Sequence, residues 1–200
     1  MIDRMADLDD IAALSWPKHT ERLTIRPVTP DDFKAMWAIR RQEPVGRWMG
    51  AESADFGPFC EFIATPDRMG KTLVVELDGQ VIGDLMLAPE DPWSQVEVAD
   101  QAKGVQAEIG WCLDPAVQGQ GLATEAVREL VRLSFEELGF RRLVAHCFAA
   151  NEPSWRLMER LGMRREAHTR QESLHRSGTW MDGLSYGLLA DEWRDAQDRG

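Results

Sequence analysis

A chain of 200 residues with 44% hydrophobic residues is long enough to bury the core of one α/β domain. Its formal net charge of −11 argues against nucleic acid as a partner, because phosphate backbones are bound by clustered lysines and arginines. No apolar run reaches transmembrane length, which argues against a membrane partner. The N-terminus is acidic and is no secretory signal, and the three cysteines lack CxxC spacing. We therefore expect a cytoplasmic protein with reduced thiols and no metal site.

The first half of the chain predicts one strand, two helices and a hairpin. Residues 1–19 have only weak helical spacing, from Ile2 and Met5 onward, and are interpreted as an N-terminal extension. Thr29 before Pro30 and two acidic residues is typical of a helix start. Asp78-Gly79 is a hairpin signal. The expected elements are a strand at Leu23–Val28, helices from Thr29 and over Asp55–Ala64, and strands at Thr72–Leu77 and Val81–Ala88.

The second half predicts alternating strands and helices after a polar loop at Glu90–Lys103. Gly139 and Gly162 are expected to end the two helices, and Ser177-Gly178 is expected to turn the last hairpin. Residues 193–200 are interpreted as a polar C-terminal tail. The expected elements are strands at Ala107–Leu113, Arg142–Phe148, Arg164–Leu174 and Thr179–Leu189, with helices at Gly121–Leu138 and Pro153–Leu161.

The chain is organised around the turn between the Ala107–Leu113 strand and the helix that follows it. Glycines there let the backbone approach a ligand closely, and the first turn of a helix presents free N–H groups and a positive dipole end. This pattern predicts a site for a phosphate or pyrophosphate. The turn lacks the lysine of a Walker loop and fits a Rossmann fingerprint poorly. A tight strand-to-helix turn without a ligand is the alternative.

Two motifs in this order resemble those of the GNAT superfamily, the acetyl-CoA-dependent N-acetyltransferases. The first is Gln118-x-x-Gly-x-Ala, and the second runs from Asn151 through Ser154 to Leu161-Gly162-Met163. The opening Thr20–Pro27 and the block Ala107–Trp111 are similar to the RimJ/RimL-like branch. The resemblance implies an α/β (α+β) GNAT fold over residues 20–192. Its mixed sheet would have about seven strands with a splayed strand 4/strand 5 pair, and about four helices would accompany it.

The resemblance also implies how acetyl-CoA would bind. Main-chain groups of Trp111 and Leu113 would pair with the pantetheine arm in the gap between the splayed strands. Asn151 would hydrogen-bond the arm from the other side, a role compatible with capping its helix. Loop residues would hold the pyrophosphate: Gln118, Gly119, Gln120, Gly121, Leu122, Ala123 and Thr124.

Acetyl transfer needs a neutral amine, an oxyanion donor and a hydrogen-bond donor for the departing thiolate. The Leu113 main-chain N–H is the donor that the family implies. Met158 stands where most of the superfamily has a tyrosine, and Ser154 resembles the substitute of this branch, with helix capping as its alternative role. Glu108 is the candidate base, acting through water. An ion pair between Glu108 and an arginine such as Arg141 or Arg142 is the alternative.

The residues that would bind the amine acceptor are the ones that the sequence defines least. Trp48 is a candidate for the acceptor pocket, although ordinary packing is as good an interpretation, and Asp182 resembles an acid that would bind the acceptor ammonium. His168 and His175 are weaker candidates for the base, and His146 is expected to be packed in place. Cys112 on a strand is expected to be inert.

The sequence thus predicts direct transfer of acetyl from acetyl-CoA to a primary amine, by branch resemblance a protein N-terminal α-amine. A small cationic amine, such as a polyamine or an aminoglycoside-like sugar, is an alternative that the acidic charge allows. A non-catalytic acyl-CoA-binding sensor is another. The branch often forms homodimers, so a homodimer is an open expectation.

Overall fold

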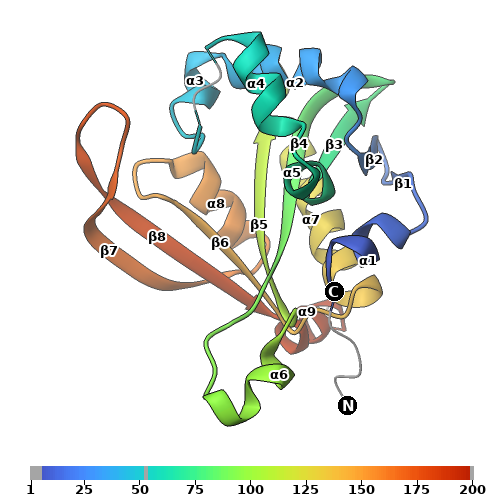
Figure 1. Ribbon diagram of the computed structural model, residues 1–200, viewed down its shortest axis with the longest axis vertical. Coiled ribbons are helices and arrows are strands. Elements are labelled where there is room, and N and C mark those ends of the chain that lie inside the picture. Colours follow the sequence, from blue (N-terminus) through green and yellow to red (C-terminus); the bar gives the residue numbers. More distant parts are fainter. Residues whose placement is uncertain (1–5, 52–53, 199–200) are drawn as a thin grey trace. The chain divides into compact units, whose positions relative to one another are not determined.

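A computed structural model describes residues 6–51 and 54–198 of the chain (Figure 1). The chain divides into two compact units. Among the described residues, the N-terminal unit comprises those within Leu8–Leu87 and Gly110–Leu130, and the C-terminal unit comprises Ala88–Ile109 and those from Val131 onward, together with Ala6 and Asp7. The two units are described separately below.

The strands pair in the order β1-β2-β3-β4-β5-β6-β8-β7. Most neighbours are antiparallel, whereas β5 (Gln106–Leu113) and β6 (Arg142–Phe148) are parallel, so the sheet is mixed. The two units each contain part of β4 (Gln80–Glu90) and of β5. The predicted mixed sheet therefore forms, with eight strands in the described part of the chain instead of about seven.

Strands of the N-terminal unit follow the predicted pattern of burial. In β2 (Leu23–Pro27), Leu23 and Ile25 are buried between half-buried polar neighbours, as alternation in a strand requires. β3 (Thr72–Leu77) joins β4 through Asp78 and Gly79, which have φ values of 51° and 75°. Two consecutive positive φ values are what a two-residue type I′ hairpin needs, so the Asp-Gly hairpin signal is confirmed. The short strand β1 (Lys18–His19) pairs with β2.

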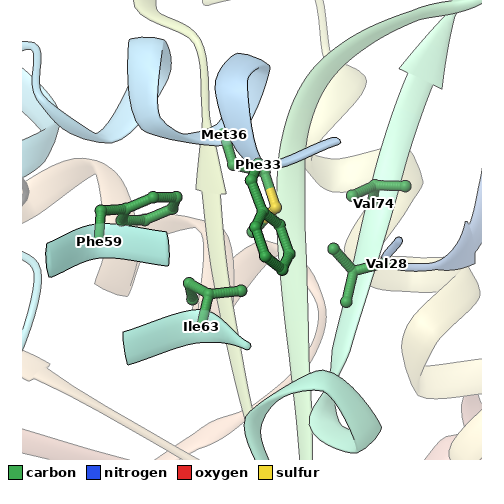
Figure 2. Packing of buried hydrophobic residues seen from close by; sticks show 6 residues of the cluster. All are labelled: Val28, Phe33, Met36, Phe59, Ile63 and Val74. Atoms are coloured by element: carbon green, nitrogen blue, oxygen red, sulfur yellow. The ribbon is translucent and has the colours of Figure 1, made fainter. Parts of the chain in front are cut away.

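Helices of the N-terminal unit bury one apolar cluster against this hairpin. The chain enters α2 (Phe33–Arg40) through the 3₁₀ turn Pro30–Asp32, where the Thr29 N–H donates to Asp32 Oδ2 at 2.7 Å. α2 packs against α4 (Phe56–Ile63). Figure 2 shows the side chains that these helices, β3 and the residue after β2 bring together, which are Val28, Phe33, Met36, Phe59, Ile63 and Val74.

The remaining helices of this unit are short, apart from α7. α1 (Leu8–Ala13) contacts α5 (Pro66–Lys71), and α3 (Glu43–Gly46) follows α2. α7 (Leu122–Arg132) begins within one residue of the predicted start of its helix. In the C-terminal unit, a π-helical turn at Leu133–Glu137 continues this helix.

In the C-terminal unit, a long antiparallel hairpin stands beside β6. β7 (Arg164–Leu174) pairs with β8 (Trp180–Leu189), and β8 pairs with β6 from Arg142 to Phe148 (Figure 1). α8 (Glu152–Arg160) contacts β6 and β7. Its position is fixed by Glu159, which accepts hydrogen bonds from Tyr186 Oη at 2.8 Å and from Arg165 at 2.9 Å.

Some expectations are wrong or fall outside the described residues. The segment Glu90–Lys103 is not simply a loop, because it contains the 3₁₀ turn Val96–Val98 and α6 (Ala99–Ala102). The helical spacing at Ile2 and Met5 lies outside the described residues. Residues after Leu189 form α9 (Ala190–Gln197), in which Trp193 is buried and donates to Glu136. The domain boundaries at 19 and 192 stay predictions.

Candidate functional site

The parallel ladder between β5 and β6 covers only the first part of β5. It joins residues 106–108 to residues 142–144, after which β5 continues to Leu113. Burial alternates up to Ile109, but Gly110 and Trp111 are both half-buried, so Cys112 takes the next buried position. Such an offset of one residue is typical of a β-bulge, which bends a strand. Trp111 and Leu113, the predicted partners of the pantetheine arm, both lie after the offset.

The loop that follows β5 has the backbone that the sequence predicts for an anion site. Asp114 starts it by accepting a hydrogen bond from the Ala116 N–H at 3.0 Å. Gly119 and Gly121 have φ values of 77° and 79°, a region that favours glycine, and α7 begins at Leu122. The first-turn N–H groups of this helix therefore follow directly on two glycines, as anion binding at a helix N-terminus requires.

Two residues that sequence reasoning did not assign contact this loop. The Arg22 guanidinium donates from Nη1 to the Gln120 carbonyl at 2.9 Å and from Nε to Glu125 Oε2 at 2.7 Å. Glu125 also accepts from Thr20 Oγ1 and from the Arg22 N–H. Burial alone would raise the pKa of Glu125, but the hydrogen bonds from Thr20 and Arg22 outweigh it and lower that pKa. The sequence feature that could have pointed to Arg22 was the Thr20–Pro27 motif, which contains this residue.

In the C-terminal unit, Asn151 and Ser154 lie at the start of α8. Asn151 is the N-cap residue, but its side chain makes no capping hydrogen bond; its carbonyl accepts from the Ser154 N–H at 3.1 Å. Ser154 is half-buried, and its side chain lowers the pKa of the Cys147 thiol. Burial has the larger effect and raises the pKa of Cys147 to about 11, so this thiol is protonated at neutral pH. The structure therefore shows no capping hydrogen bond to α8 from the side chain of Asn151 or Ser154.

Glu108 is half-buried on β5, opposite Val144 of β6. Of the two arginines considered as its partners, Arg142 donates to Gln106 at 3.1 Å and to both oxygens of Glu166. The roles of Glu108 as base or as ion-pair partner both stay predictions.

Asp182 shapes the last hairpin. Its carboxylate accepts from the Gln171 N–H at 3.0 Å and lies 3.0 Å from His168 Nε2. Gln171 has a φ of 48° within a β7 bulge, so Asp182 stabilises an unusual backbone. The hydrogen bond from Gln171 and, after it, that from His168 lower the pKa of Asp182. His146 is exposed and bonded to Ser185 at 2.9 Å, so the expectation that it is packed in place is wrong.

The aromatic acceptor candidate lies in the N-terminal unit. Trp48 is half-buried, and the Arg47 guanidinium lies 5.1 Å from its ring. Its neighbour Met49 packs against the cluster of Ile39, Val45 and Cys112. Cys112 is fully buried, and burial, followed by the charge of Asp84, raises its pKa, so the thiol has no thiolate character for covalent catalysis.

Each unit therefore holds one set of the predicted site residues. The N-terminal unit contains Trp48, Trp111, Leu113 and the loop from Gln118 to Thr124, and the C-terminal unit contains Glu108, Asn151, Ser154 and Asp182. Within residues 6–51 and 54–198, no group of three His, Cys, Asp or Glu side chains could hold a metal ion. None of the helices described there is long and apolar enough to cross a membrane.

Comparison with known families supports the resemblance to the GNAT superfamily. The family model described as "Acetyltransferase (GNAT) domain" matches residues 22–164. The "Uncharacterized N-acetyltransferase YnaD" of Bacillus subtilis (strain 168) is 36% identical over 86 residues, which are 43% of this chain and 50% of YnaD. The chain thus spans half the length of that relative.

Two longer matches cover most of the chain. The B. subtilis protein named "Putative ribosomal N-acetyltransferase YdaF" is 29% identical over 185 residues, 88% of this chain and 96% of YdaF. A crystal structure of a GNAT-family acetyltransferase from Bacillus anthracis superposes with a TM-score of 0.70 at 27% identity, over 88% of this chain and all of that one. The predicted fold is thereby confirmed, with more helices than the four or so expected.

Proposed function

The chain belongs to the GNAT family of acetyltransferases, and on that premise we propose that it transfers acetyl from acetyl-CoA to the α-amine of a protein N-terminus. The observation that carries the cofactor assignment is the continuous segment from the offset in β5 to the glycine loop and α7. Trp111 and Leu113 would pair with the pantetheine arm, and the amides from Gly119 to Thr124 would hold the pyrophosphate. The three free cysteines fit the predicted cytoplasmic location.

Transfer would proceed in one ternary complex. Glu108, through water, removes a proton from the acceptor ammonium, and the amine nitrogen attacks the thioester carbonyl carbon. The Leu113 N–H stabilises the resulting oxyanion. The C–N bond forms, the C–S bond breaks, and the nitrogen releases its second proton to solvent. Ser154 donates a hydrogen bond to the departing thiolate, which takes up a proton from solvent.

We predict that Ser154→Ala lowers kcat by about 100-fold while the KM for acetyl-CoA stays nearly unchanged, because a hydrogen bond to the leaving thiolate strengthens only as negative charge develops during reaction. Thiol release at saturating acetyl-CoA measures the effect. Ser177→Ala, in the exposed β7–β8 turn, is the matched control. A Ser154→Ala enzyme with unchanged turnover would remove this residue from the mechanism.

The acceptor class rests on the RimJ/RimL-like motifs and on the name of YdaF, which describes a ribosomal N-acetyltransferase. Wild-type protein should release thiol from acetyl-CoA with Ala- or Ser-starting peptides. Spermidine and an aminoglycoside are the competing acceptors, which the net charge of −11 would also attract. Turnover with a small amine alone would overturn the peptide assignment. Tight acetyl-CoA binding without turnover of any acceptor would favour the sensor.

A further inference from the structure

The turn before β2 places one arginine between the loop and α7 of the N-terminal unit. Arg22 Nη1 donates to the Gln120 carbonyl at 2.9 Å. Its Nε and Nη2 both reach Glu125 Oε2, at 2.7 and 2.6 Å. The same guanidinium therefore joins the middle of the loop to the first turn of the helix.

The direction of one amide follows from this contact. A trans peptide is planar, so its C=O and N–H point in opposite directions. Because Arg22 holds the Gln120 carbonyl, the N–H of Gly121 in the same peptide points away from the guanidinium. Gly119 and Gly121 would otherwise leave this stretch with unusual conformational freedom. The contact thus orders an N–H group that the proposed function assigns to the pyrophosphate.

Both carboxylate oxygens of Glu125 accept hydrogen bonds. Beyond the guanidinium, its Oε1 accepts from Thr20 Oγ1 at 2.5 Å and from the Arg22 N–H at 2.8 Å. Its side chain is only 15% exposed, whereas that of Arg22 is 42% exposed. These donors come from one turn, Thr20–Arg22, so hydrogen bonds join the chain segment before β2 to the first turn of α7.

Charge balance gives the contact a second role. A carboxylate in the first turn of a helix favours the helix dipole but opposes a bound phosphate nearby. The Arg22 guanidinium neutralises Glu125 within hydrogen-bond distance, so the dipole and the loop amides act on the ligand without an opposing net charge.

We propose that Arg22, fixed by Glu125 and Thr20, is a positioning residue for the pyrophosphate of acetyl-CoA. This inference rests on the proposed function. The Thr20–Pro27 motif would then support the glycine loop directly, although Arg22 and Gln120 are 98 residues apart in the chain.

The test compares two acetyl donors that differ in the pyrophosphate. Arg22→Gln should raise the KM for acetyl-CoA about tenfold, which corresponds to about 1.4 kcal/mol. S-acetylpantetheine lacks the pyrophosphate and adenosine, so the kcat/KM for this donor should be the same in Arg22→Gln as in the wild type. The double variant Arg22→Gln/Glu125→Gln should bind acetyl-CoA more tightly than Arg22→Gln, because the uncompensated carboxylate is gone. Arg22→Lys keeps the charge but cannot bind Glu125 and the Gln120 carbonyl at the same time as a guanidinium does, so its KM for acetyl-CoA should lie between those of the wild type and Arg22→Gln.

Lys71→Gln is the control, since it removes a cation from an ion pair with Asp67 elsewhere in the same unit. An unchanged acetyl-CoA KM in Arg22→Gln, or equal losses with both donors, would overturn the inference. A double variant no better than Arg22→Gln would overturn the charge argument. Wild-type protein that neither binds nor uses acetyl-CoA would instead refute the proposed function, so the two failures are distinguishable.

Discussion

Replacing Asp84 with asparagine is expected to destabilise the protein by about 3–5 kcal/mol, because the change leaves a buried arginine without its counter-ion. Asp84 lies on β4 with its side chain 4% exposed, and Arg40 at the end of α2 is 12% exposed. Arg40 Nε donates to Asp84 Oδ2 at 3.0 Å, and Nη2 donates to the other oxygen. Burial alone would lower the pKa of Arg40, but Asp84 more than offsets this and raises it.

Urea denaturation would measure this cost as a lower midpoint with an unchanged slope. A second variant separates the loss of the ion pair from the cost of a buried, unpaired charge: Arg40→Met/Asp84→Leu removes both ions and should come within about 1 kcal/mol of the wild type. Asp67→Asn is the matched control, because the Asp67 side chain is 65% exposed and its pair with Lys71 should contribute under about 1 kcal/mol. A single variant as stable as the control would show that Arg40 reaches water without Asp84.

Local features were predictable from the sequence. The Asp78-Gly79 hairpin was predictable because both residues tolerate positive φ, and the glycines of the 118–124 loop likewise identify their own backbone geometry. Long amphipathic helices such as α7 were also found. α3, α5 and α6 were missed, because helices of four to six residues are too short to show a helical period.

Contacts between distant segments were not predictable. Arg22 and Glu125 are 103 residues apart, and Arg40 and Asp84 are 44 apart, so no spacing in the chain relates them. The error at His146 has the same origin. Alternation shows that neighbouring residues of β6 face opposite sides of the sheet, but which side is covered at that position depends on tertiary packing. The candidate site was therefore predictable where it consists of local backbone, and not where it depends on supporting side chains.

Gly83→Ala is expected to impair both folding and acetyl transfer. A Cβ at Gly83 on β4 would lie 2.3 Å from the Cys112 carbonyl oxygen and 2.9 Å from Leu113 Cα, distances that no real side chain adopts. These are backbone atoms of β5, so the strand itself must move. Such overpacking costs about 1–3 kcal/mol. The displaced residue is Leu113, whose N–H is the proposed oxyanion donor, and loss of such a donor lowers kcat by about 100- to 1,000-fold.

Gly110→Ala is the matched control on β5, because its Cβ would meet only Met86 Cε and Cβ, at ordinary contact distances of 3.5 and 3.6 Å. Both variants would be compared by thermal unfolding and by kcat with acetyl-CoA at a temperature at which circular dichroism shows each to be folded. If folded Gly83→Ala keeps the wild-type kcat, the Leu113 N–H is not the oxyanion donor. If kcat falls in Gly83→Ala but not in Gly110→Ala, the loss follows from the displaced strand at Leu113, since both substitutions add the same methyl group to neighbouring strands.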